Sequence, residues 1–158
     1  MKIYTSYFYQ VRNFPINAVA FSTAMWDPKW FHDFKDRKYK FKDKRGIWNG
    51  LRVPPLVPGE NCAGLCRGVE YCNTGNPNTC LFLKNYYEQL CELNIHKVIN
   101  RLEEIAEAVK KKEGFKEEPI IILLVYETPK NKCSERQMIH KWFSSNGIKI
   151  KEWGSVGE

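Results

Sequence analysis

The second half of the chain alternates between helical and strand-like patterns of apolar residues. The unbroken apolar run from Ile120 to Tyr126 follows Pro119 and is typical of a central parallel strand that is buried on both faces. Before it, apolar residues recur at helical spacing over Leu81–Leu93, and again between a capping Asn94 and a stop at Gly114. We therefore predict two helices that lead into a central strand.

The end of the chain predicts a final helix and an edge strand. Ser134-Glu135-Arg136-Gln137 has the pattern of a capping box, in which a serine and a glutamine satisfy the first N–H groups of a helix. Gly147 is then suited to end that helix. Residues Ile148–Lys151 alternate between isoleucine and lysine, and such alternation is typical of a strand at the edge of a sheet.

The first half of the chain has weaker patterns. Ile3–Val11 is rich in tyrosine and phenylalanine and Ala18–Met25 is a run of small apolar residues, so both segments are predicted to be strands, separated by a break at residues 13–15. Asp27 is a good capping residue and a proline follows it, which predicts a short helix over Pro28–Phe34.

Residues 35–80 lack sustained periodicity. Glycines, prolines and charged residues dominate, which indicates a long loop excursion rather than a linker between domains. A chain of 158 residues fits one domain, because such a length buries roughly two thirds of its unfolded surface around one core. We predict a single α/β domain over residues 1–158, with a small, mainly parallel sheet, helices on both faces and a long Cys-rich loop excursion.

The charge of the chain changes the picture of its partners. A formal net charge of +7 favours polyanions such as nucleotides or nucleic acid, because clustered lysines and arginines displace counterions from phosphates. The alternative is that this charge serves solubility alone. No apolar run is long enough to span a bilayer and the first residues lack a signal-peptide pattern, so we expect a cytoplasmic protein without a membrane partner. The sequence leaves the oligomeric state open.

The strongest candidate chemistry lies just after the predicted central strand. In open α/β sheets, ligands bind beyond the carboxyl ends of strands, where loops lead into helix N-termini that favour anions. Tyr126 can stack or donate a hydrogen bond, Glu127 can act as an acid or base, and Cys133 directly precedes a helix start, where a thiolate is favoured. The residues expected to act in catalysis are therefore Tyr126, Glu127 and Cys133.

Further residues of this loop and of the first strand are expected to bind a ligand. Lys130 and Arg136 suit phosphate, and the first strand contributes side chains if it neighbours the central one. The expected ligand-binding residues are Ser6, Tyr7, Arg12, Lys130, Ser134, Glu135 and Arg136. In the structural alternative, Glu127 and Arg136 pair with each other, Cys133 fills space and Ser134 only caps the helix. His140 is isolated and is expected to face solvent.

Four cysteines lie in the loop excursion, which is too polar to fold by itself. Four thiolates around a zinc ion would supply the missing folding free energy. The predicted structural zinc ligands are Cys62, Cys66, Cys72 and Cys80, with three, five and seven residues between them. Because this is not the usual two-residue spacing, ordinary thiols, disulfides and an iron–sulfur cluster stay open as alternatives. Cys91 falls on a helical stripe and is expected in the core.

A basic stretch with interleaved aromatic residues runs from Lys35 to Trp48. Bases stack on aromatic rings beside a cationic track when proteins hold single strands without sequence readout. The residues expected to contact nucleic acid are Lys38, Tyr39, Lys40, Phe41, Lys42, Lys44 and Arg45. The same alternation also fits an edge strand whose lysines discourage aggregation.

Several motifs together resemble a known bacterial family. The segment 123–130 (Leu-Leu-Val-Tyr-Glu-Thr-Pro-Lys), followed by Cys133, Glu135-Arg136 and Trp142, resembles the family catalogued as domain of unknown function 488, closest to its phage and clostridial members. In that family an apolar strand ends in Cys-Tyr-Glu and a Cys-His-Arg triplet opens the last helix. Here Val125 replaces the first cysteine and Glu135 replaces the histidine. The resemblance implies the fold and implies no activity.

These patterns give one leading functional hypothesis and two alternatives. The chain has no Gly-rich phosphate loop, nucleophile elbow or paired-histidine metal motif. The leading hypothesis is that the protein binds a nucleotide or nucleic-acid phosphate at the 126–136 loop and processes it there, with Glu127 as acid or base. The alternatives are a non-catalytic module that sequesters its ligand and a zinc-stabilised nucleic-acid binder that uses mainly residues 35–48.

Overall fold

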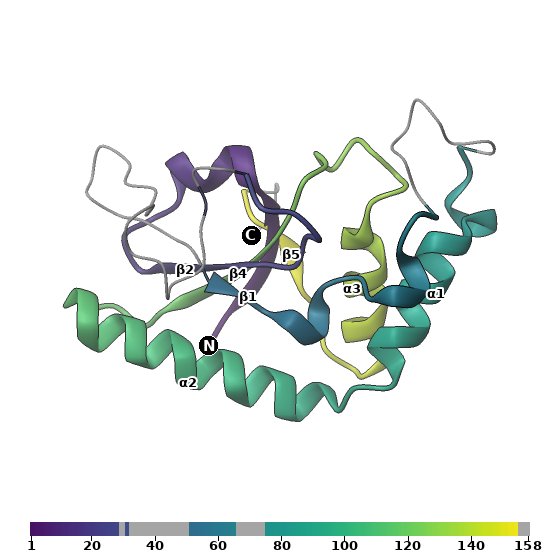
Figure 1. Ribbon diagram of the computed structural model, residues 1–158. Coiled ribbons are helices and arrows are strands. Elements are labelled where there is room, and N and C mark those ends of the chain that lie inside the picture. Colours follow the sequence, from purple (N-terminus) through teal and green to yellow (C-terminus); the bar gives the residue numbers. More distant parts are fainter. Residues whose placement is uncertain (29–30, 32–50, 66–74, 155–158) are drawn as a thin grey trace.

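The sheet of the protein is entirely parallel. The computed structural model describes residues 1–28, 31, 51–65 and 75–154. Within these residues the sheet has the strand order β3-β2-β4-β1-β5, in which all neighbours run parallel (Figure 1). The strands are β1 (Ile3–Tyr7), β2 (Ala18–Ser22), β3 (Leu51–Arg52), β4 (Ile120–Val125) and β5 (Lys151–Glu152). The predicted parallel α/β class is confirmed.

Strand β4 is the centre of the sheet, as its apolar run predicts. It pairs with β2 from Ala18↔Ile120 to Ser22↔Leu124 and with β1 from Ile3↔Ile121 to Tyr7↔Val125. The side chains of Ile121–Val125 are all fully buried, because both faces of the sheet are covered. A strand with neighbours on both sides and cores on both faces needs apolar residues at every position.

The described α-helices cover one face of the sheet. These are α1 (Leu81–Cys91), α2 (Ile95–Glu113) and α3 (Glu135–Ser145). They share a hydrophobic cluster with alternate residues of β4, namely Ile121, Leu123 and Val125. Figure 1 shows α2 lying along the lower side of the sheet and α1 packed beside α3 at one end. Burial of Tyr86 and Trp142 between α1, α3 and the sheet anchors this layer.

A 3₁₀ helix and single aromatic side chains cover the other face. The helix η1 (Phe8–Asn13) brings Phe8 and Val11 onto Ile122 and Leu124, together with Phe14 and Phe31. Helical segments therefore lie on both faces, although the α-helices described here share one. The prediction that the first strand continues to Val11 is wrong, because its partner β4 ends at Val125 opposite Tyr7 and offers no further pairing.

The ends of the elements agree with most of the predicted caps. Asn94 Oδ1 accepts hydrogen bonds from the N–H groups of His96 and Lys97 at 3.0 and 3.2 Å, and Gly114 ends α2 in a left-handed conformation (φ 76°). Strand β2 ends at Ser22 rather than Met25, and β5 begins at Lys151 rather than Ile148. Among the described strands β5 pairs only with β1, which confirms its predicted position at the edge of the sheet.

Short 3₁₀ helices connect β3 to α1. They are η3 (Pro54–Leu56), η4 (Glu60–Cys62) and η6 (Pro77–Thr79). Most of the predicted helix Pro28–Phe34 lies outside the described residues, although Phe31 is placed and fully buried. Among the helices that the structure describes, none combines the length and the apolar character that a bilayer crossing requires.

Candidate functional site

The carboxyl ends of the central strands form the edge at which the predicted loop lies. The chain that follows β4 passes to α3 on one face of the sheet, whereas Phe31, which follows β2, lies in the cluster on the opposite face. Where the connections after two neighbouring strands go to opposite faces of the sheet, they leave a gap between them at the carboxyl ends of the strands. Ligands bind in such gaps in open α/β sheets. The ends of β2 and β4 are therefore the place to look for a site.

Tyr126 is the first residue after β4, and its ring is 47% exposed. The ring packs against Phe8 at 4.9 Å between centroids, so one side is supported while another faces solvent. Partial burial raises the pKa of the Tyr126 hydroxyl, the negative charge of Asp27 raises it further and the positive charge of Arg52 opposes the change. The phenol is thus neutral at physiological pH and able to donate a hydrogen bond.

Asp27 and Arg52 hold the loop after β2 beside this tyrosine. The Ser22 hydroxyl donates to the Asp27 carboxylate, and Arg52 Nη1 lies 3.4 Å from the same carboxylate oxygen. Arg52 Nη2 also donates to the backbone oxygen of Met25 at 2.8 Å. The segment between these contacts carries Trp26, whose side chain is 76% exposed.

Glu127 is held by the start of α3. Its carboxylate accepts a hydrogen bond from the Ser134 hydroxyl at 3.0 Å. The Ser134 oxygen also accepts from the N–H of Arg136 at 3.2 Å and so caps the helix, as predicted. The reciprocal half of the predicted capping box does not form, because Gln137 Oε1 is buried and makes no hydrogen bond within the described structure.

Glu135 is a buried carboxyl group at the first position of α3, with 9% of the residue exposed. Burial raises its pKa from 4.5 to about 8, and the charge of Glu127 adds to this, while its own backbone N–H and Arg136 oppose the shift. The group is therefore largely protonated at neutral pH. Tyr86 and Cys62 lie close enough for the charge of Glu135 to raise the pKa of both, after burial as the main cause.

Arg136 points into the protein rather than toward solvent. Its Nε donates to Glu152 Oε1 at 2.5 Å, its Nη2 donates to the backbone oxygen of Glu127 at 2.8 Å, and the side chain is 7% exposed. Nη1 is buried and lacks a hydrogen-bond partner in the described part of the chain. The structural alternative paired Glu127 with Arg136. The structure joins them through the backbone oxygen of Glu127, whereas the carboxylate that pairs with Arg136 is that of Glu152, an ion pair that the sequence analysis missed.

Thr5 and His140 extend this buried network. The Thr5 hydroxyl donates its single hydrogen to Glu152 at 2.8 Å, so at 2.6 Å from His140 Nε2 it must accept a hydrogen from the ring. Burial lowers the pKa of His140, and the positive charge of Arg136 lowers it further, so the ring is neutral with its proton on Nε2. The expectation that His140 faces solvent is therefore wrong: the ring is partly buried and joins α3 to β1.

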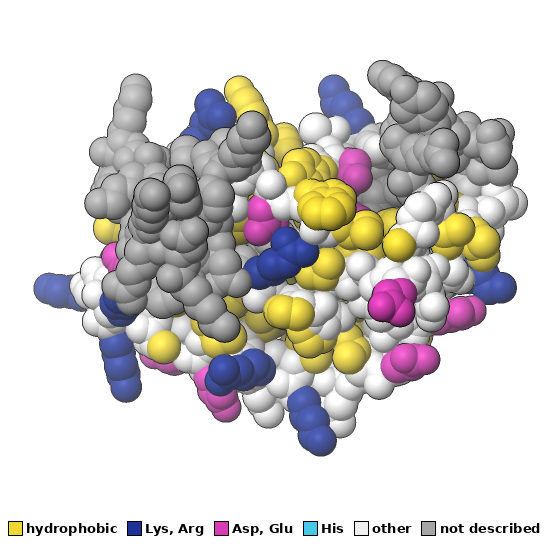
Figure 2. Space-filling view, viewed as in Figure 1, with side chains coloured by type: hydrophobic (Ala, Val, Ile, Leu, Met, Phe, Trp, Pro, Cys, Tyr) yellow, Lys and Arg dark blue, Asp and Glu magenta, His cyan; other side chains and the backbone are white. Residues whose placement is uncertain are grey.

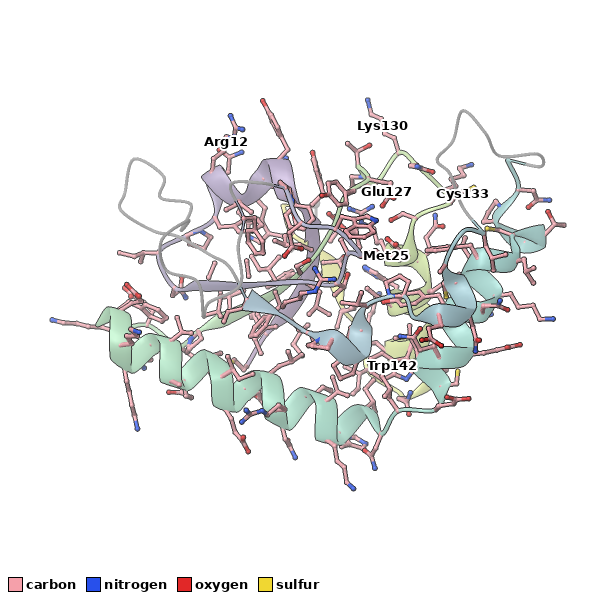
Figure 3. The ribbon with its side chains drawn as sticks, in the orientation of Figure 1. Arg12, Met25, Glu127, Lys130, Cys133 and Trp142 are labelled. Atoms are coloured by element: carbon pink, nitrogen blue, oxygen red, sulfur yellow. The ribbon has the colours of Figure 1, made fainter. Side chains whose placement is uncertain are left out.

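The helix start differs from the expected anion site. Ser134 occupies one of the first N–H groups of α3, and two carboxyl groups, Glu127 and Glu135, lie next to it. A phosphate at the same point would be repelled by the Glu127 charge. The exposed cations nearby are instead Lys130 and Lys132, on the loop between β4 and α3. Figure 3 shows Lys130 extending away from the body, above Glu127.

The other predicted site residues are spread over both faces. Tyr7 lies on the α3 side, with the Arg136 guanidinium 5.9 Å from its ring centroid. Ser6 pairs with Leu124 on the η1 side and is fully buried, and its hydroxyl has no hydrogen-bond partner among the described residues. β1 does neighbour β4, as the prediction required. Cys133 is partly buried, and its thiol lies 3.6 Å from the backbone oxygen of Gly75.

Arg12 lies on η1, at the same edge as Lys130. Its guanidinium stacks over the ring of Tyr9 at 4.2 Å, and its Nε donates to the Tyr9 backbone oxygen. Both residues are exposed, and the Tyr9 side chain is 61% accessible to solvent. Figure 3 shows Arg12 and Lys130 projecting from the same side of the molecule.

The predicted zinc ligands are described only in part. Cys62 is buried in the hydrophobic core, where desolvation raises the pKa of its thiol, and Cys80 is partly buried at the start of α1. Cys66 and Cys72 lie outside the described residues. Within the described ranges, no three His, Cys, Asp or Glu side chains are grouped to hold a metal ion. The structural zinc site stays a prediction. Cys91, expected in the core, is exposed.

The predicted nucleic-acid contacts between Lys35 and Trp48 also lie outside the described residues, so they stay predictions.

Two cavities lie away from the carboxyl edge. One, of about 290 Å³, is lined by Met1–Tyr4 and Ile148–Lys151 beside β1 and β5. The other, of about 410 Å³, lies between η6, α1 and α3 and includes Tyr87 and Lys141.

Comparisons of the chain with protein-family models, with curated proteins and with solved structures found no match. The resemblance noted from the residues around Tyr126 and Glu135 therefore stays a prediction, and the function has to be argued from the site itself.

Proposed function

We propose that the protein binds a nucleotide or a nucleic-acid phosphate at the carboxyl edge of its sheet, beside the loop between β4 and α3. The observation that carries this proposal is the placement of an exposed ring, Tyr126, and a carboxylate, Glu127, at the end of the central strand. A ring of this kind stacks against a base, because every base has an aromatic face. The loop then supplies exposed Lys130 and Lys132 for the phosphate.

Glu127 is the residue that we propose as the acid or base in a reaction of the bound ligand. General acid–base catalysis needs a carboxylate held in a defined orientation within hydrogen-bond reach of the ligand. The Ser134 hydroxyl provides that orientation at 3.0 Å. Glu135, one residue further on, is a protonated carboxyl group at neutral pH and is kept from solvent.

A second candidate function is sequestration of the ligand without reaction. The observation that favours it is that most of the polar atoms closest to the loop already have protein partners. Ser134 donates to Glu127, and Arg136 donates from Nε to Glu152 and from Nη2 to the backbone oxygen of Glu127.

A binding assay with a nucleotide panel tests the proposal. We expect calorimetry to detect binding of at least one nucleotide by the full chain. The double variant Lys130→Ala/Lys132→Ala should then raise its Kd by roughly 10²- to 10⁴-fold, because each direct charged contact contributes about 1.5–3 kcal/mol and the two together about 3–6 kcal/mol. The matched control is Lys97→Ala/Lys111→Ala on the exposed side of α2. Equal loss in both double variants would show a general charge effect and would refute the proposed site.

Chromatography of the incubated nucleotides separates the two candidate functions. Conversion that is lost in Glu127→Gln, while binding is kept, supports catalysis by Glu127. Bound but unchanged nucleotide in the parent protein supports sequestration. Conversion that survives in Glu127→Gln excludes the proposed acid–base role.

A further inference from the structure

The exposed aromatic residues of the described chain gather at one edge of the sheet. They are Tyr9, Trp26 and Tyr126, with 61%, 76% and 47% of each side chain exposed. They follow β1, β2 and β4, which are the three neighbouring strands at the centre of the sheet. Large exposed aromatic side chains cost hydration free energy and are uncommon on surfaces that bind nothing.

The segments that carry the three rings are joined to one another at the ends of the strands. Phe8, next to Tyr9, packs against the ring of Tyr126 at 4.9 Å. On the other side, Thr23 donates from its N–H and from its hydroxyl to the backbone oxygen of Leu124, which ties the segment carrying Trp26 to the end of β4. The end of β4 is therefore joined both to the segment that carries Tyr9 and to the segment that carries Trp26.

The exposed charged residues on the loops that carry these rings are all basic. On the loops after the three strands, residues 8–17, 23–28 and 126–134, the exposed charged residues are Arg12, Lys130 and Lys132. The two acidic residues of these loops, Asp27 and Glu127, are partly buried and hydrogen-bonded to Ser22 and Ser134. Figure 2 shows hydrophobic and basic side chains on the upper part of the surface, with acidic side chains beside them.

We propose that Tyr9, Tyr126 and Trp26 form a stacking surface for single-stranded nucleic acid, whose phosphates are contacted by Arg12, Lys130 and Lys132. This rests on the proposed function and narrows it to single-stranded nucleic acid. A mononucleotide occupies one ring, whereas rings on the segments that follow three neighbouring strands accept successive bases of a single strand. A duplex keeps its bases stacked inside and offers these rings no free base faces. Arg12 already stacks on Tyr9, which directs its guanidinium to the edge where a phosphate would pass.

Fluorescence anisotropy with a labelled oligothymidine of about 12 nucleotides tests the proposal on the full chain. We expect the single strand to bind more tightly than a duplex of the same length. Tyr126→Ala and Trp26→Ala should each raise the Kd roughly 5- to 100-fold, because base–aromatic stacking has that effect when a ring is removed. Tyr126→Phe keeps the ring and should bind like the parent. Leu81→Ala removes an equally exposed apolar side chain from α1 and is the control.

Salt dependence provides the second readout. For single strands the logarithmic slope of affinity against salt changes by about 0.7 for each phosphate contact. Arg12→Ala/Lys130→Ala should therefore flatten the slope by about 1.4. An unchanged slope contradicts the assigned phosphate contacts.

The outcomes separate this inference from the proposed function. Binding of mononucleotides without tighter binding of the oligonucleotide keeps the proposed function and overturns the stacking surface. Oligonucleotide binding that is unaffected by loss of either ring, or a duplex that binds equally well, also overturns it. Failure of mononucleotides and oligonucleotides alike removes both proposals.

Discussion

Replacement of Glu135 by glutamine should stabilise the protein in a pH-dependent way. Glu135 lies 9% exposed at the first position of α3, and burial there raises its pKa from 4.5 to about 8. Because the folded state holds this proton more tightly than the unfolded state, the wild-type protein loses stability as the pH rises from about 4.5 to about 8. Glutamine has nearly the same shape and no proton to lose, so Glu135→Gln removes this loss.

The magnitude follows from the gap between the two pKa values. One pKa unit corresponds to about 1.4 kcal/mol, so the full gap corresponds to roughly 5 kcal/mol above pH 8. Local opening that admits water lowers this figure, and it is therefore an upper bound. We expect the free energy of unfolding of Glu135→Gln to exceed that of the wild type by roughly 3 kcal/mol at pH 7 and to match it closely below pH 4.

Urea unfolding at several pH values measures this difference. Glu104→Gln on the exposed surface of α2 is the matched control and should shift stability by less than about 1 kcal/mol at every pH. The charge of Glu127 is the second cause of the raised pKa of Glu135. Glu127→Gln should therefore lower the pKa of Glu135 and make the free energy of unfolding less dependent on pH than in the wild type. If the difference in unfolding free energy between Glu135→Gln and the wild type does not change with pH, Glu135 is not a buried carboxyl group with a raised pKa.

Three further predictions concern the described contacts. Arg136→Met leaves the partly buried Glu152 carboxylate without its cationic ion-pair partner and should cost about 3–5 kcal/mol in urea unfolding, whereas Arg101→Met, which breaks an exposed pair with Glu104, should cost less than about 1 kcal/mol. NMR should show that the His140 ring titrates below 6.5, so that the contribution of His140 to stability falls as the pH drops below 6.5; a normal pKa would contradict its burial. Asn94→Ala should cost about 1 kcal/mol, because two N–H groups of α2 lose their acceptor, and an unchanged midpoint would contradict the cap.

The parts of the fold that local patterns specify were predictable. Strand β4 is apolar at each position from Ile120 to Val125 because it is covered on both faces, and such a run predicts a strand without knowledge of its partners. The starts of α2 and α3 were predicted from their capping residues Asn94 and Ser134. The end of β1 was not, because it depends on where its partner strand stops, and the aromatic residues after Tyr7 fit a strand and a 3₁₀ helix equally well.

The candidate site was predictable in position and only in part in its contacts. Tyr126 and Glu127 follow β4 directly, so a strand ending there places them at the carboxyl edge. The partner of Arg136 could not be predicted from the sequence, because Glu152 comes within reach of Arg136 only through the pairing of β5 with β1. The exposed ring of Trp26 was not predicted either, because the exposure of a side chain depends on the path of its loop in the folded protein and not on its neighbours in the sequence.

The most direct test of the ligand site is an NMR titration of the ¹⁵N-labelled full chain with adenosine monophosphate. The account predicts chemical-shift changes concentrated at Tyr126–Lys132, with saturation at a single Kd. Changes concentrated instead around Met1–Tyr4 and Ile148–Lys151, where the 290 Å³ cavity lies, or no changes at all, would contradict it.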